Sequence, residues 1–287
     1  MKALSRAVVA LLFAATAQAG AAKDSPQLAR GKYLMESVVA CGNCHTPRDE
    51  KGRRVAGRTL AGGMVFDEPP FKAYASNLTP DRETGIGKWT DAQIVRAIRE
   101  GVRPDGSVIG PPMPIGFYRH LSDADAAAIV AYLRAQAPVK NAVPKSEYRI
   151  PLPPNYGPPV RGVKAPAAGE TVKYGEYLAN IGHCMDCHTP RDDKGMLVMS
   201  RLGAGGMPFK GPWGESVSRN PTPHDAGLKA WSDAEIARAI REGVDRGGQR
   251  LRPPMAFDFY RNIRDDDMRA LIAYLRSLPP QAPGAKP

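Results

Sequence analysis

The chain has 287 residues, of which 43% are hydrophobic, and a formal net charge of +11 at pH 7. A chain of this length accommodates two domains of ordinary size. Residues 140–168 hold five basic side chains and one acidic one, while the blocks on either side are nearly balanced. This pattern disfavours nucleic acid as a partner, although a modest positive bias can steer the chain toward an acidic protein face.

The first 22 residues have the features of a secretory signal peptide. Lys2 and Arg6 precede the apolar run AVVALLFAATA at positions 7–17, and AQA at positions 17–19 suits a signal peptidase. The run is too short to span a bilayer comfortably. No later stretch is long and apolar enough to do so. We therefore expect export to the periplasm and no transmembrane segment in the mature chain.

The remaining sequence contains two copies of one pattern. CGNCHTPRDEKG, beginning at Cys41, returns as CMDCHTPRDDKG, beginning at Cys184, and the offset between copies stays between 142 and 144 along the chain. Two long copies indicate a domain duplication rather than a solenoid of short repeats. We expect a signal peptide at 1–22, domains at 23–139 and 169–287, and a linker at 140–168.

Each copy is expected to be mostly helical. In the first copy, Thr90 and Gln93 form a capping box that begins a helix, and Gly101 suits a left-handed helix end. The apolar spacing at 126–133 predicts an amphipathic last helix. The second copy repeats these signals at Ser232 with Glu235, Gly243, and Met268 to Leu275. Strand-like alternation is hard to find in either copy, so we predict a mainly α chain.

The segment between the copies is rich in proline, which favours extended geometry and a semi-rigid spacer. Its apolar side chains favour a strap that lies on the domains over a floppy tether. These apolar residues are Tyr148, Ile150, Leu152 and Tyr156.

The five residues CGNCH, which begin at Cys41, are compatible with three kinds of site. A thioredoxin-like disulfide needs a preceding strand and a βαβ neighbourhood, which neither copy contains. A zinc site needs four ligands, and a fourth ligand is not obvious in either copy. Haem attachment explains more, because two thiols add to the two vinyl groups and the following histidine becomes an axial iron ligand. We predict two covalently bound haem c groups, held by Cys41, Cys44 and His45 and by Cys184, Cys187 and His188.

The other face of each iron has two candidate ligands. Met113 and Met255 lie 68 and 67 residues after the two motif histidines, each in a proline-flanked loop before the last helix. A thioether raises the reduction potential of haem iron, and the prolines stiffen the loop. Met64 and Met207, each 19 residues after a motif histidine, are the competing choice. We favour Met113 and Met255.

With these motifs, the chain resembles the class I cytochromes c in their dihaem, tandem-domain form. More narrowly, SNLTPDRETGIGKWTDAQIVRAIREGV, which begins at Ser76, is similar to the cytochrome subunits of membrane-bound bacterial alcohol, aldehyde and gluconate dehydrogenases. Those subunits typically carry three CxxCH domains and a membrane-anchoring tail, whereas this sequence contains two CxxCH motifs. The resemblance implies a mainly α fold with two tandem class I cytochrome c domains joined by a Pro-rich linker.

The resemblance also implies roles for individual residues. It assigns Cys41, Cys44, His45 and Met113 to the first haem, and Cys184, Cys187, His188 and Met255 to the second. It implies that the helix carrying Gly31 and Tyr33 packs on the helix carrying Tyr132, and that Gly175, Tyr177 and Tyr274 do the same in the second domain. As possible haem propionate contacts, Trp89 and Trp231 would donate an indole N–H and Arg48 and Arg191 would form ion pairs; core packing and solvated surface are the alternatives.

We therefore predict an exported dihaem c-type cytochrome that carries single electrons between redox proteins and is not itself an enzyme. Two filled axial positions leave neither iron with a site for substrate. One alternative is the cytochrome subunit of a periplasmic dehydrogenase complex, and a terminal oxidase is a further possible partner. An alternative of another class is a dihaem enzyme, such as a peroxidase or sulfur-compound oxidase. That alternative requires one haem in which Met113 or Met255 does not bind iron.

Overall fold

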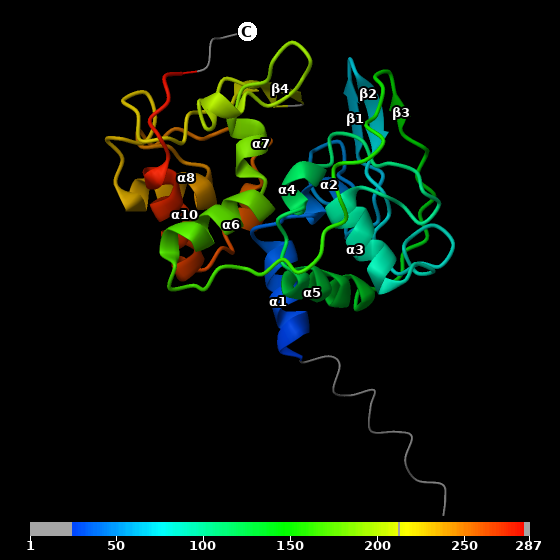
Figure 1. The fold of residues 1–287 in the computed structure, drawn as a ribbon. Helices are drawn as coiled ribbons and strands as arrows, with labels where there is room; N and C mark the ends of the chain where they lie inside the picture. Colours follow the sequence, from blue (N-terminus) through cyan, green and yellow to red (C-terminus); the bar gives the residue numbers. More distant parts are fainter. Residues whose placement is uncertain (1–24, 212, 284–287) are drawn as a thin grey trace, which may run out of the picture.

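The computed structural model describes residues 25–211 and 213–283 and divides them into two similar halves (Figure 1). The predicted signal peptide lies outside the described residues. The first half contains α1 (Pro26–Glu36), α2 (Gly42–His45), β1 (Val65–Glu68), β2 (Phe71–Tyr74), α3 (Asp91–Glu100), α4 (Ile115–Tyr118) and α5 (Asp123–Arg134). After β3 (Glu147–Tyr148), the second half contains α6 (Thr171–Ile181), α7 (Cys184–His188), the 3₁₀ turn η1 (Met199–Arg201), β4 (Pro208–Gly211), β5 (Gly214–Val217), α8 (Asp233–Glu242), α9 (Phe257–Tyr260) and α10 (Asp265–Ser277).

The first and last long helices of each half cross at a glycine. A Cβ atom on Gly31 of α1 would lie 1.9 Å from the carbonyl oxygen of Ala128 and 3.0 Å from Cβ of Tyr132 in α5. Gly175 of α6 lies in the same way against α10, beside Tyr274. Only glycine permits so close a backbone approach. The helix packing expected from the resemblance is therefore confirmed in both halves.

The predicted helix signals are also confirmed. The Thr90 hydroxyl accepts a hydrogen bond from the Gln93 backbone N–H, and the Gln93 side chain accepts one from the Thr90 N–H. Gly101 ends α3 with a φ of 67°, in the left-handed region. The second half repeats the capping box at Ser232 and the glycine stop at Gly243. These local signals fix where α3 and α8 begin and end.

The expectation that strands are hard to find is wrong in detail. β1 and β2 form an antiparallel hairpin in which Val65 lies opposite Tyr74, and β4 and β5 form another. β3 adds a third strand by pairing Tyr148 with Phe71. Each strand has four residues or fewer, and β1 exposes three of its four side chains. Alternation over so short a window does not identify a strand.

The segment after α5 lies along the first half. We call residues 141–163 the strap. The strap begins with a hydrogen bond from the Asn141 N–H to Thr84 Oγ1 and ends with one from the Asp123 N–H to the Val163 carbonyl oxygen. Between these points β3 joins the hairpin of the first half. The strap therefore contacts this half along most of its length.

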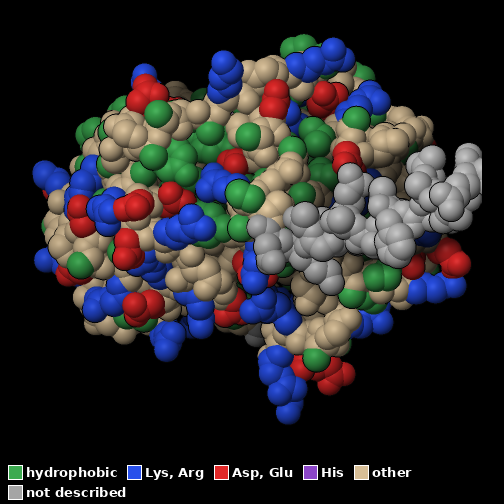
Figure 2. Space-filling view, turned by 90° about the horizontal axis from the view of Figure 1, so that it is seen from below, with side chains coloured by type: hydrophobic (Ala, Val, Ile, Leu, Met, Phe, Trp, Pro, Cys, Tyr) green, Lys and Arg blue, Asp and Glu red, His purple; other side chains and the backbone are tan. Residues whose placement is uncertain are grey.

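Charged side chains of both signs are interspersed over the face that Figure 2 shows. Many of them are paired, including two basic residues beside or within the strap. Lys140 Nζ lies 2.5 Å from Glu83 Oε2, and Arg149 Nη2 lies 3.4 Å from Asp67 Oδ1. Exposed pairs of this kind contribute little to stability. The surface is therefore mixed in sign, with an overall positive excess.

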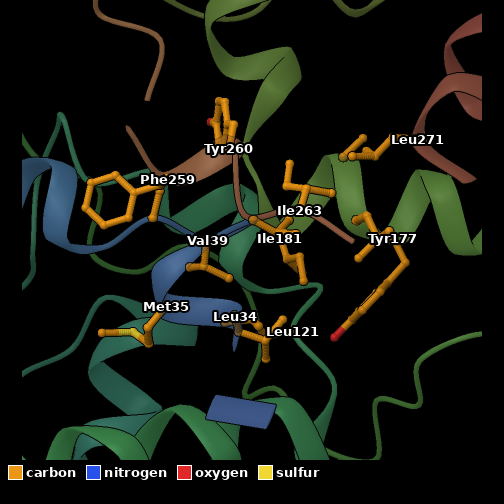
Figure 3. Close-up of a cluster of buried hydrophobic side chains, with 14 of the residues drawn as sticks. Leu34, Met35, Val39, Leu121, Tyr177, Ile181, Phe259, Tyr260, Ile263 and Leu271 are labelled. Carbon is orange, nitrogen blue, oxygen red and sulfur yellow. The ribbon is translucent and has the colours of Figure 1, made fainter. Parts of the chain in front are cut away.

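The two halves share one hydrophobic core, because side chains from both meet at the boundary between them (Figure 3). Leu34 of α1 is fully buried, and Val39 lies close after it in the sequence that leads to α2. They face Ile181, Tyr260 and Ile263 of the second half. Cys41 and Cys184, the first cysteines of the two CxxCH motifs, also pack against this core.

Candidate functional site

The cysteines of both CxxCH motifs are half-buried, and no disulfide joins them. Cys41 caps the short helix α2 and Cys184 begins the short helix α7, while the second cysteine of each motif lies within its helix. Burial raises the pKa of Cys41 to about 12 and that of Cys44 to about 11. The pKa values of the Cys184 and Cys187 thiols are raised in the same way, to about 11 and about 12. A redox-active CxxC pair has a lowered thiol pKa. The environment therefore disfavours the disulfide interpretation.

The zinc interpretation also lacks support in the arrangement of side chains. Among the described residues, no group of three or more His, Cys, Asp and Glu side chains is placed to hold a metal ion. A structural zinc site needs four such ligands. Within this part of the chain, the two thiols and the imidazole of each motif are therefore not grouped with a further ligand as a structural zinc site requires.

Each motif histidine has one ring nitrogen held by a backbone carbonyl group. His45 Nδ1 lies 2.8 Å from the Ser76 carbonyl oxygen, and His188 Nδ1 lies 2.6 Å from that of Arg219. A carbonyl oxygen only accepts hydrogen bonds, so Nδ1 carries the proton and the lone pair of Nε2 is free for a metal. Burial lowers the pKa of both histidines, which keeps them neutral. This geometry fits an axial imidazole ligand.

The loops around each histidine repeat between the two halves. The His45 carbonyl oxygen accepts a hydrogen bond from the Gly62 N–H at 2.8 Å, and Thr46 Oγ1 accepts one from the Leu60 N–H at 3.0 Å. The corresponding contacts in the second half are Gly205 to His188 and Gly203 to Thr189. Sequence reasoning missed the carbonyl acceptors of Ser76 and Arg219, because a backbone acceptor leaves no residue-type signature.

The candidate methionines lie in different environments. Met113 and Met255 are half-buried and pack against the shared core, in the loops before α4 and α9. Met64 immediately precedes β1, and Met207 immediately precedes β4. Their carbonyl groups accept hydrogen bonds from the residue that follows the second strand of each hairpin. The loop methionines thus belong to the same packed interior as the CxxCH helices.

Arg48 and Arg191 connect the CxxCH helix to the turn that follows it. Arg48 donates to the Asn43 side chain at 3.1 Å and to the Gly52 carbonyl oxygen at 2.9 Å. Arg191 donates to Asp186 at 2.6 Å and to the corresponding glycine carbonyl. Both arginines thereby hold a residue between the two cysteines. This bracing role was not anticipated from the sequence.

Trp89 and Trp231 precede α3 and α8 and are half-buried against the shared core. The carbonyl oxygen of Trp89 accepts a hydrogen bond from Arg134 of α5, and that of Trp231 accepts one from Arg276 of α10. Each tryptophan therefore anchors the start of a helix to the last helix of its half. Packing is one role of both side chains.

Two family models match the chain in tandem. The model described as cytochrome c oxidase, cbb3-type, subunit III matches residues 26–133, and the model described as cytochrome c matches residues 172–279. Together they cover both halves, each with one CxxCH motif. No helix of the described part of the chain is long and apolar enough to traverse a bilayer.

Three relatives place these matches in context. The chain is 32% identical to a dihaem cytochrome c-type protein of Cereibacter sphaeroides, over 83% of this chain and 82% of that protein. It is 30% identical to the cytochrome subunit of the fructose dehydrogenase of Gluconobacter japonicus, over 91% of this chain and 54% of that subunit. It is also 32% identical to the cytochrome c subunit of the quinone alcohol dehydrogenase of Gluconobacter oxydans, over 89% of this chain and 55% of that subunit. The chain thus spans about half the length of the two dehydrogenase subunits.

Proposed function

The chain belongs to the dihaem c-type cytochromes, with two cytochrome c domains in tandem, and on that premise we propose that its four cysteines form the thioether bonds. Such domains carry two covalently bound haem c groups, and the chain is an electron-transfer protein. In this proposal Cys41 and Cys44 hold the first haem, and Cys184 and Cys187 hold the second. The haem, when bound, supplies one-electron oxidation and reduction at its iron.

His45 and His188 bind the irons through Nε2 in this proposal. The observation that carries it is the Nδ1 contact of each histidine with a backbone carbonyl oxygen, at 2.8 and 2.6 Å. Such a contact fixes the tautomer and the ring orientation and raises the basicity of the other nitrogen. This contact supports the assignment of both histidines as axial ligands.

Met113 and Met255 provide the second axial ligands. Their proline-flanked loops and their packing on the shared core support this assignment over Met64 and Met207. A thioether ligand raises the reduction potential of haem iron. Two filled axial positions leave no vacancy for substrate, so the protein carries electrons and does not itself catalyse a reaction.

The propionate contacts belong to the same proposal. Trp89 and Trp231 donate an indole N–H to a haem propionate, while their half-buried rings pack on the core. Arg48 and Arg191 each use two of their five N–H donors to hold the CxxCH motif and the turn after it. The remaining N–H donors of each arginine pair with a propionate.

We also propose the organisation of the whole chain. A signal peptide at 1–22 directs export to the periplasm, and mainly α domains at 23–139 and 169–287 are joined by a Pro-rich linker at 140–168. Relatives named as cytochrome subunits of fructose, alcohol and gluconate dehydrogenases support a dehydrogenase as electron donor. Membership of such a complex is therefore the leading alternative to a freely diffusing carrier.

The test of the haem assignment is the intact mass of the exported protein. It should exceed that of the mature polypeptide by two haem groups. Replacing Cys184 and Cys187 together with alanine should remove one haem and leave the other covalently bound. One haem in the unaltered protein, or disulfide-bonded motifs, would overturn the proposal.

A further inference from the structure

The strap covers the loop that leads to Met113. We propose that Tyr148 and Tyr156 of the strap position Met113 by clamping residues 109–110, so that the strap controls iron coordination in the first domain alone. The inference rests on the proposed role of Met113 as an iron ligand. It adds a positioning function to a segment that otherwise only connects the two domains.

Tyr156 joins the Met113 loop to the end of α3. Its hydroxyl donates to the Ile109 carbonyl oxygen at 2.8 Å. Its ring lies over Gly101, where a Cβ atom would be 2.9 Å from two ring carbons. The Ile109 N–H in turn donates to the Gly101 carbonyl oxygen at 2.7 Å. The backbone at Ile109 is therefore held from both sides, by α3 and by the strap.

Tyr148 and Leu152 cover the next residue of the same loop. A Cβ atom on Gly110 would lie 2.5 Å from the Tyr148 ring and 2.7 Å from Leu152. Gly110 immediately precedes the two prolines before Met113. Tyr148 is also paired with Phe71 of the hairpin. The strap therefore packs between the hairpin and the loop and contacts Gly110 directly.

The strap is anchored on both sides of these contacts. Near Tyr148, Arg149 donates to the Glu68 carbonyl oxygen at 2.8 Å. After Tyr156, the Val160 N–H donates to Glu100 at 3.0 Å and the Gly162 N–H donates to Asp123 at 2.9 Å. These anchors hold Tyr148 and Tyr156 in place. The anchor contacts therefore offset part of the entropy cost of ordering the two tyrosines, in addition to their contacts with residues 109–110.

The second domain holds its methionine loop mainly with residues of its own, although the Asn43 side chain of the first domain also donates to the Pro254 carbonyl oxygen at 3.5 Å. The Leu251 N–H donates to the Gly243 carbonyl oxygen at 2.7 Å, as Ile109 does to Gly101. Phe257 of α9 lies over Gly243; its counterpart in the first domain, Ile115, contacts Gly101 together with Tyr156. Ser216 of β5 donates its hydroxyl to the Pro253 carbonyl oxygen at 2.7 Å. A change in the strap should therefore leave the Met255 loop untouched.

The experiment compares Tyr156→Phe and Tyr156→Ala with Ser216→Ala in the protein carrying both haems. Tyr156→Phe removes only the hydroxyl, and Ser216→Ala removes the matched hydroxyl contact of the second domain. Hydrogen exchange at the Ile109 amide measures how often the loop opens. The thioether–iron absorption and the two reduction potentials measure whether methionine binds each iron. Haem content and circular dichroism verify that each variant is folded.

We expect exchange at Ile109 to rise about tenfold in Tyr156→Phe and further in Tyr156→Ala, as one hydrogen bond and then the ring contact are lost. The potential of one haem should fall and its thioether signature weaken, with the other haem unchanged. Ser216→Ala should leave Ile109 exchange and that haem as they were. Unchanged exchange at Ile109, or equal shifts in both haems, would overturn the inference.

A loosened loop with both haems unaffected would also overturn it, and Met113→Ala identifies the reason. If Met113→Ala alters one haem, Met113 is a ligand that does not depend on the strap. If Met113→Ala is also silent, the ligand assignment itself is wrong. The two failures are therefore distinguishable.

Discussion

Tyr33 of the first domain donates its hydroxyl to Asp267 Oδ2 of the second domain, 2.6 Å away and 234 residues further along the chain. Tyr177 makes the reciprocal bond to Asp125 Oδ2, also at 2.6 Å. The two tyrosines occupy equivalent positions in the two copies, and so do the two aspartates. The first helix of each domain is therefore bonded to the last helix of the other domain. Bonds to ionised acceptors are among the stronger hydrogen bonds in proteins.

Two arginines complete this interface. Arg30 contacts Asp125 with two nitrogens, both at 2.8 Å, and Arg264 lies over the Tyr33 ring at 4.1 Å from its centroid. Asp125 and Asp267 are both buried, so each negative charge needs the partners that it has. The arrangement links the two domains through buried charged and aromatic side chains, and we expect it to make them unfold together.

The first prediction tests this unit by replacing Tyr33 and Tyr177 with phenylalanine. Each replacement leaves a buried carboxylate without one partner and should lower the free energy of unfolding by about 1–3 kcal/mol. We expect one calorimetric transition for the unaltered protein and two, one for each domain, for the double variant.

The matched control is Tyr132→Phe. The Tyr132 hydroxyl donates to Glu36 at 2.6 Å within the first domain, so this variant should lower stability without separating the transitions. If the double interface variant still unfolds in one transition at an unchanged temperature, the two bonds do not couple the domains.

Local sequence signals predicted much of the fold and the haem-binding motifs. The resemblance to dihaem cytochromes c and to dehydrogenase cytochrome subunits is confirmed by the tandem family matches and the relatives. Capping at Thr90 and the glycine stop at Gly101 were readable because their partners lie within a few residues. The CxxCH motifs were readable for the same reason.

Long-range contacts were not readable. Nothing near Tyr33 in the sequence indicates Asp267, because the two residues are 234 positions apart and belong to different domains. The Ser76 carbonyl group that orients His45 is equally invisible, since every residue has a carbonyl group. The strap contacts of Tyr156 depend on how the Pro-rich segment is routed, which composition does not determine.

The second prediction concerns the axial methionines. Met113→Ala and Met255→Ala should each remove one thioether–iron absorption, lower the potential of one haem and open that iron to carbon monoxide. Met64→Ala and Met207→Ala serve as controls and should leave all three measurements unchanged. Should the controls alter a haem while the loop variants do not, the ligand assignment must be exchanged.

The third prediction concerns pH and the anchor of the strap. A hydrogen bond from Arg99 is the main cause that lowers the pKa of Asp123 below its usual value, and the carboxylate also accepts the Gly162 N–H. A lowered pKa means that the contact stabilises the protein fully above the usual value of about 4, and that the stabilisation is lost as pH falls through the lower folded value. We therefore expect the strap to loosen as pH falls below about 4.

Hydrogen exchange at the Gly162 amide, compared between neutral pH and the acid range, measures this change. Asp123→Asn should raise exchange of the Gly162 amide at neutral pH. It should also remove the part of the pH dependence that exceeds the ordinary pH dependence of amide exchange. Asp105→Asn removes another carboxyl with a lowered pKa, which is held by Ser107, and should leave Gly162 unaffected. An Asp123→Asn variant with the same pH dependence as the unaltered protein would contradict the assignment.

The last prediction concerns the docking of redox partners. Loss of Lys2 and Arg6 with the signal peptide would reduce the formal charge from +11 to +9, and the haem propionates offset part of the remainder. Positive charge raises the rate at which an anionic reductant or an acidic protein face arrives, more than it raises affinity. Electron-transfer contacts are small, below about 1,200 Å² in total, so steering should be visible in the rate. Salt screens it, with a Debye length of about 10 Å at 0.1 M.

Stopped-flow reduction across a salt series provides the measurement. Reduction by an anionic small-molecule reductant should slow as ionic strength rises, and reduction by a cationic one should accelerate. The variants Arg161→Glu, near the end of the strap, and Lys164→Glu, one residue beyond it, should weaken both trends, because residues 140–168 hold five basic side chains and one acidic one. Rates that do not depend on salt with either reductant would mean that the charge excess does not act at the haem edges. A diffusing partner would then have no electrostatic guide, and a permanent complex subunit would be the better description of this cytochrome.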